Sequence, residues 1–158
     1  MPITSPTASP STAVAAHAID ATKVYGSGHT EVRALDSVTV GFDAQTFTAI
    51  MGPSGSGKST LMHCVAGLDS LTSGQVFIAG MDLTGLDAKA LTQVRRDQVG
   101  FVFQSFNLIP TLNAMENITL PMDLASRKPD RSWLDKVVGT VGLANRLKHR
   151  PSELSGGQ

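Results

Sequence analysis

A stretch of nine residues, Gly52 to Thr60, sets the strongest limit on what this chain can fold into. Its sequence, GPSGSGKST, fits the pattern G-x-x-x-x-G-K-S/T. The apolar residues 47–51 precede it and are predicted to form a strand, and residues 61–66 follow it as a plausible helix. Strand, glycine-rich turn and helix in this order are typical of an α/β fold whose loop surrounds phosphate groups.

The residue types of this loop suit the binding of a nucleoside triphosphate. Glycines let the backbone curl around phosphates with its N–H groups inward, and Lys58 supplies a positive charge for the β- and γ-phosphates. The Ser59 hydroxyl can ligate Mg²⁺, and the helix that begins near Lys58 adds the positive end of its dipole. The alternative is a glycine- and serine-rich turn without a ligand. The residues predicted to bind the nucleotide here are Gly52, Ser54, Gly55, Ser56, Gly57, Lys58, Ser59 and Thr60.

Composition and charge argue against several classes of protein. With 158 residues, 13 basic and 13 acidic side chains and 41% hydrophobic residues, the chain is typical of a globular domain. The balanced charge argues against a nucleic-acid partner, which would need a broad basic face. The one cysteine, Cys64, is expected to be buried, and it favours a reducing cytoplasm because it cannot form an internal disulfide. No apolar run approaches the roughly 18 residues needed to cross a bilayer, so membrane association would require a partner.

The chain is predicted to divide into three parts. Residues 1–16 are rich in Pro, Ser and Thr and are expected to be a flexible extension. Residues 17–103 alternate between strand and helix and form a nucleotide-binding α/β core. Residues 104–158 form a mainly helical subdomain. The predicted strands are 18–25, 32–40, 47–51, 75–79 and 99–103.

Helix signals follow the phosphate loop in both parts. Asp87 is expected to cap a helix in the core, on which Leu91 and Val94 share a face. Residues 113–120 favour a helix in the subdomain, ended before Pro121 because the residue preceding a proline avoids helical ψ.

Two more helices are expected near the end of the chain. Ser132 and Asp135 indicate a capping pair for one that is closed by Gly142, and residues 143–149 favour the other. The apolar stripe of the first is Leu134, Val137, Val138 and Val141. Five further apolar side chains belong either to a core or to a partner-docking surface, and these are Phe106, Leu108, Ile109, Leu112 and Met115.

The pentapeptide LSGGQ at residues 154–158 decides among the nucleotide-binding families. With it, the chain resembles the nucleotide-binding subunit of an ABC transporter, for which this pentapeptide is the signature. The amino-acid sequence of residues 100–110 and 151–153 is similar to that of the lipoprotein-release and macrolide-export branch of this superfamily. The resemblance covers residues 17–158 and rests on five motifs in the expected order, namely Tyr25, Gly52–Thr60, Gln104, Glu116 with Asn117, and Ser155–Gln158.

The resemblance implies a fold and a role for each motif. The fold is a P-loop NTPase core, with a mixed sheet and an antiparallel β edge, into which a helical subdomain is inserted. Tyr25 would stack on adenine, and Gln104 would bind Mg²⁺ or the attacking water. Ser155, Gly156, Gly157 and Gln158 would face the γ-phosphate held by a second subunit, which implies a head-to-tail dimer around two ATP molecules.

The family pattern also extends past this sequence. After the signature, the family continues with a helix, a strand ending in Asp-Glu and a later histidine, none of which occurs by residue 158. We therefore expect an incomplete core and a coding sequence that continues in frame, with the Asp-Glu motif roughly 20 residues beyond Gln158. We also expect this chain to bind ATP weakly and to lack efficient hydrolysis.

Three functions remain open from the sequence. The first is an ATP-hydrolysing subunit of a transporter, held on the inner face of the plasma membrane by a transmembrane permease subunit. The second is a related ATPase that acts in translation or DNA repair without a membrane partner. The third is a non-catalytic product.

Overall fold

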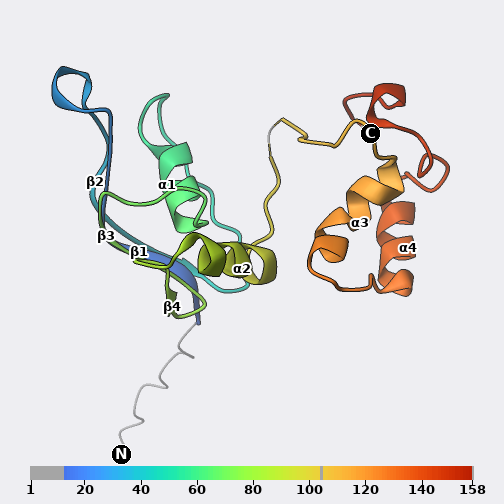
Figure 1. Cartoon of the computed structure of the whole chain (residues 1–158), viewed down its shortest axis with the longest axis horizontal. Coiled ribbons are helices and arrows are strands. Elements are labelled where there is room, and N and C mark those ends of the chain that lie inside the picture. Colours follow the sequence, from blue (N-terminus) through green and yellow to red (C-terminus); the bar gives the residue numbers. More distant parts are fainter. Residues whose placement is uncertain (1–12, 104, 158) are drawn as a thin grey trace, which may run out of the picture. The chain divides into compact units, whose positions relative to one another are not determined.

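The chain divides into two units, residues 1–99 and 100–158 (Figure 1). A computed structural model describes residues 13–103 and 105–157 of the chain. The first strand begins at Val14, three residues before the predicted start of the core. The predicted domain boundary at 103 and 104 stays a prediction.

The first unit contains a four-stranded antiparallel sheet in the order β2-β1-β3-β4. Ala18 lies in its middle, opposite Val40 on one neighbouring strand and Val76 on the other. Three of the predicted strands, 18–25, 32–40 and 75–79, are confirmed with small shifts at their ends. The strands are β1 (Val14–Tyr25), β2 (Val32–Asp43), β3 (Ser73–Ile78) and β4 (Met81–Asp82), and a short 3-10 helix, η1 (Gly28–Thr30), joins the first two.

Two helices share a core with this sheet. They are α1 (Lys58–Val65) and α2 (Ala88–Gln98). As predicted, Asp87 caps α2, because its carboxylate accepts a 2.7 Å hydrogen bond from the N–H of Ala90. The core is apolar and buried, and it consists of Ala18, Ala21, Val76, Ile78, Leu83 and Val94, with Val65 and Leu91 packed against it.

Two predicted strands are wrong in this structure. Residues 47–51 and 99–103 have no strand conformation, and the exposed fractions of Phe47 and Val102 are 99% and 96%. An extended segment is held as a strand by the ladder of hydrogen bonds to a neighbouring strand. Neither segment pairs with a described strand, so their apolar sequences alone do not hold them in a sheet.

The second unit is helical, as predicted, but its helix ends differ from the prediction. It contains α3 (Ala114–Leu124), α4 (Arg131–Thr140) and a 3-10 helix, η2 (Pro151–Glu153). Pro121 lies inside α3 because its ring fixes a helical φ and removes a single N–H donor. The N–H of Ala125 then donates to the Pro121 carbonyl at 3.1 Å, which continues the helical turn.

The predicted cap of α4 is wrong, and the sequence analysis missed the cap of α3. Asp130, not Ser132, caps α4, and its carboxylate accepts from the N–H of Trp133 at 3.1 Å. Asn113 and Glu116 form a reciprocal capping box at the start of α3, with hydrogen bonds of 2.9 and 2.8 Å. The spacing N-x-x-E could have shown it.

The predicted helix at 143–149 is a series of turns instead. The carbonyls of Leu147 and His149 accept hydrogen bonds of 3.0 and 2.8 Å from the N–H groups of Met115 and Ala114. These are among the first N–H groups of α3, which have no partner inside their own helix. In this segment, hydrogen bonds to α3 therefore take the place of the hydrogen bonds that a helix at 143–149 would make within itself. Gly142 closes α4 as predicted, with φ at +74°.

Candidate functional site

The phosphate loop of residues 52–60 connects into α1 through Gly57, where a side chain has no space. Gly57 is the N-cap of α1 and has φ of +83°. A Cβ at this position would collide with the carbonyl oxygen of Ala34. Gly57 thus combines a left-handed conformation with close backbone packing, and both requirements favour glycine.

The loop turns tightly before it reaches the helix. The N–H of Ser56 donates to the carbonyl of Pro53 at 3.3 Å, and the Ser56 hydroxyl donates to the same oxygen at 2.9 Å. Gly55 occupies the third position of this turn with φ of +78°, in open space. Ser54 and Gly55 are exposed at the loop, where a ligand can reach them.

Lys58 folds back over this turn. Its Nζ donates to the Pro53 carbonyl at 2.6 Å and to the Ser56 hydroxyl at 3.3 Å. An ammonium group has three donors, so Lys58 can keep these contacts and still donate to an anion. Because the first turn of α1 contains no acidic residue, the charge of Lys58 and the helix dipole both favour an anion here.

Ser59 and Thr60 follow Lys58 in the first turn of α1. The side chain of Ser59 is exposed, so its hydroxyl is available as an oxygen ligand. Among the described residues, no group of three or more His, Cys, Asp and Glu side chains could hold a metal ion. Mg²⁺ accepts a hydroxyl oxygen as a ligand together with phosphate oxygens and water.

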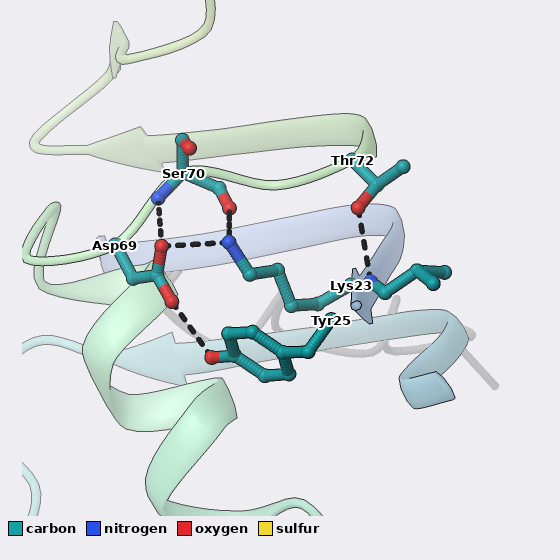
Figure 2. Close-up of polar contacts among 6 residues, drawn as sticks. Lys23, Tyr25, Asp69, Ser70 and Thr72 are labelled. Carbon is teal, nitrogen blue, oxygen red and sulfur yellow. Dashed lines mark hydrogen bonds and ion pairs between the residues drawn. The ribbon is translucent and has the colours of Figure 1, made fainter. Parts of the chain in front are cut away.

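Tyr25, at the end of β1, lies beside the start of α1. Thr60, the last residue of the phosphate loop, is close enough for its side chain to influence the pKa of the Tyr25 hydroxyl. The same hydroxyl donates a 2.7 Å hydrogen bond to the carboxylate of Asp69, as Figure 2 shows. The structure therefore places this aromatic ring, which is 41% exposed, next to the helix that carries the phosphate loop.

The hydrogen bonds around Tyr25 change the pKa values of three side chains. The hydrogen bond from Lys23 holds the pKa of Asp69 below its ordinary value. Burial alone would lower the pKa of Lys23, but the bond to Asp69 raises it above its ordinary value. The hydrogen bond to Asp69 also raises the pKa of Tyr25, because it favours the protonated phenol. These residues are therefore an ion pair with a neutral tyrosine at neutral pH.

Cys64 takes no part in this site. It is 2% exposed, and burial raises the pKa of its thiol. A buried thiol with a raised pKa is a poor nucleophile, so the expectation of a small buried side chain is confirmed.

The second unit carries the other predicted site residues. Ser155, Gly156 and Gly157 are exposed and line a groove of about 950 Å³ together with residues 105–108 and Leu154. The Phe106 ring lies close to Gly156, since a Cβ at Gly156 would be 4.0 Å from its Cζ. Gln104 and Gln158 lie outside the described residues.

The five apolar residues predicted to belong either to a core or to a docking surface fall into two groups by their exposure. Phe106, Leu108 and Ile109 are exposed by 68%, 45% and 39%. Leu112 and Met115 are partly buried against the second unit. The first three therefore remain available to a partner.

Sequence reasoning missed two residues near the predicted site, Lys23 and Asp69. Lys23 is 8% exposed near the end of β1, and a buried lysine requires a partner. The alternation of β1 puts Lys23 and Tyr25 on the same face, which is the available sequence signal. No local signal indicates Asp69, which is distant in sequence.

Comparisons with known proteins give one consistent family. The family model described as ABC transporter matches residues 35–158. An uncharacterized ABC transporter ATP-binding protein of Thermotoga maritima is 44% identical over 89% of this chain and 61% of its own length. The lipoprotein-releasing system ATP-binding protein LolD of Hahella chejuensis is 40% identical over 86% and 60%. The macrolide export ATP-binding/permease protein MacB of Hyphomonas neptunium is 42% identical over 88% and 22%.

Solved structures agree with these relatives. A dimeric post-hydrolysis state of the ATP-binding cassette MJ0796, bound to ADP and Pi, has a TM-score of 0.79 and 38% identity, over 90% of this chain and 64% of that chain. The chain thus spans less than two thirds of the length of the relatives described here. In the part of the chain that the structure describes, no helix is long and apolar enough to cross a membrane.

Proposed function

The chain belongs to the ABC transporter ATP-binding family, and from this we propose that it is the nucleotide-binding part of a transporter subunit that works by ATP binding, dimerisation and hydrolysis. The predicted family and fold class are confirmed. The observation that carries the proposal is the phosphate loop, in which Lys58 and the N-terminus of α1 face the same turn.

We place the triphosphate at the backbone N–H groups of residues 52–60. Lys58 would contact the β- and γ-phosphates, as a point charge that adapts its position to the phosphate oxygens. Mg²⁺, which neutralises developing charge in phosphoryl transfer, would be held by the hydroxyl of Ser59 and by Gln104. Tyr25 would stack on the adenine ring, since it lies beside Thr60 at the end of the loop.

The second unit supplies the partner side of the proposal. We propose that Ser155, Gly156, Gly157 and Gln158 contact the γ-phosphate bound by another copy, in a head-to-tail homodimer. The dimeric cassette MJ0796, bound to ADP and Pi, supports this arrangement. The exposed Phe106, Leu108 and Ile109 provide a surface for a transmembrane permease subunit. One relative is named an ATP-binding/permease protein, which supports a place on the inner face of the plasma membrane through the permease.

Replacing Lys58 tests the nucleotide-binding assignment. Removing a charge that pairs with a bound phosphate typically costs about 2–5 kcal/mol, so Lys58→Ala should weaken ATP binding by at least about thirtyfold. Titration calorimetry with Mg²⁺-ATP measures this change. Lys89→Ala is the matched control, because Lys89 is an exposed lysine on α2 and carries the same charge change. Equal ATP affinity in the two variants would contradict the proposed site.

A further inference from the structure

Asp69 connects the strand that carries Tyr25 to the helix that carries the phosphate loop. One carboxylate oxygen accepts the hydroxyl of Tyr25 at 2.7 Å, and the other accepts Nζ of Lys23 at 2.6 Å (Figure 2). The N–H groups of Leu68 and Asp69 donate to the carbonyl of His63 in α1 at 2.8 and 3.2 Å. Asp69 is thus bonded to β1 through its side chain and to α1 through its backbone.

The segment around Asp69 is held in place by further bonds. Lys23 also donates to the carbonyl of Ser70 at 2.5 Å. The hydroxyl of Thr72 accepts from the N–H of Val24 at 2.9 Å, and the N–H of Thr72 donates to the carbonyl of Thr22 at 2.9 Å. With these contacts on both sides, the Asp69 carboxylate has little freedom to move relative to β1.

These contacts constrain the tyrosine ring in two ways. The bond to Asp69 fixes the direction of its hydroxyl, and Nζ of Lys23 lies 4.8 Å from the ring centroid. A cation over one face of an aromatic ring occupies that face, so a planar ligand can stack only on the other. A ring that is already oriented also loses less conformational entropy when a ligand binds.

We propose that Asp69 and Lys23 are positioning residues that hold the Tyr25 ring with one face free for the base of the bound nucleotide. This rests on the proposed function, in which Tyr25 is the contact for adenine. Neither residue touches the nucleotide in this arrangement. Their effect should therefore fall on the base and not on the phosphates, which bind at residues 52–60.

The first test observes the tyrosine directly. Tyr25 is the only tyrosine of the chain, so ultraviolet absorption at alkaline pH reports the ionisation of this one phenol. The hydrogen bond to Asp69 raises the pKa of Tyr25, and Asp69→Asn should bring it back toward the ordinary value. An unchanged titration curve in Asp69→Asn would overturn the proposal.

The second test separates base from phosphate binding. Affinities for Mg²⁺-ATP and for Mg²⁺-tripolyphosphate, which has no base, are measured by calorimetry for each variant. Stacking of one base on an aromatic side chain corresponds to roughly a fivefold to hundredfold effect, which Tyr25→Ala should remove from the ratio of the two affinities. Asp69→Ala and Tyr25→Phe should each lower the ratio by about threefold or more, and their combination should add nothing further.

A merely structural role for Asp69 gives a different result. Asp69→Ala would then lower stability but leave the ratio of ATP to tripolyphosphate affinity unchanged, which would overturn the inference alone. Asp87→Ala is the control for lost stability, since it removes the cap of α2 away from the ring. No binding of ATP to the unaltered protein would overturn the proposed function together with the inference.

Discussion

Gly57 shows how much of the site depends on one residue without a side chain. Its φ of +83° and the carbonyl of Ala34 beside it leave no space for a Cβ. Gly55 has a similar φ, +78°, but stands in open space. A side chain at Gly55 would therefore meet backbone strain alone, whereas one at Gly57 would meet both strain and a steric collision.

We expect Gly57→Ala to be much more damaging than Gly55→Ala. A left-handed alanine costs about 1–2 kcal/mol, and this is the whole effect expected at Gly55. At Gly57 a collision with backbone adds about 1–3 kcal/mol or shifts the start of α1. Urea unfolding followed by the fluorescence of Tyr25 in the same unit measures the difference. Equal stability of the two variants would contradict the close packing of Gly57 against Ala34.

At the scale of helices and strands, Asp130 offers the sharpest comparison between sequence and structure. The sequence predicts Ser132 as part of the cap of α4, but the bond to the N–H of Trp133 comes from Asp130. We expect Asp130→Ala to destabilise the second unit by about 1 kcal/mol, and Ser132→Ala to change its stability much less. Trp133 is the only tryptophan, so its fluorescence during urea unfolding reports this unit. A larger loss of stability in Ser132→Ala than in Asp130→Ala would show that Ser132 is the cap, as the sequence predicted.

Local sequence signals predict a helix or strand well where the interactions that form it involve residues close in sequence. The capping side chain of Asp87, the strand predicted at 18–25 and the closing Gly142 depend on signals within a few residues, and each is confirmed. Residues 47–51 and 99–103 depend on neighbouring strands, so their apolar composition does not determine their conformation. Asp69 is invisible to local analysis because its two side-chain partners are 44 and 46 residues away.

At the scale of the whole molecule, the predicted nucleotide contacts are divided between the two units. The phosphate loop and Tyr25 belong to the first unit, and residues 155–157 belong to the second. Exposed residues occur in both sets, Ser54, Gly55 and Ser59 in the first and residues 155–157 in the second, and Lys58 adds a positive charge to the first. Two ATP molecules between two head-to-tail copies would use both sets at once, which is the arrangement we propose.

Gly156 allows this arrangement to be tested without disturbing the fold. A Cβ there meets only the Phe106 ring at 4.0 Å, an ordinary contact, so Gly156→Asp should fold normally. Its carboxylate would face the γ-phosphate of the opposite copy, and like charges at such a distance repel strongly when water is excluded.

We therefore expect ATP to shift the unaltered protein toward a dimer in analytical ultracentrifugation, and Gly156→Asp to remain a monomer with ATP. The same variant should bind ATP as a monomer with unchanged affinity, because residues 52–60 and Tyr25 lie in the other unit. Lys58→Ala should lose both ATP binding and the dimer. Without a bound nucleotide, nothing connects residues 52–60 of one copy to residues 155–157 of the other. An ATP-dependent dimer that persists in Gly156→Asp would show that residues 155–157 do not face the nucleotide of a second copy.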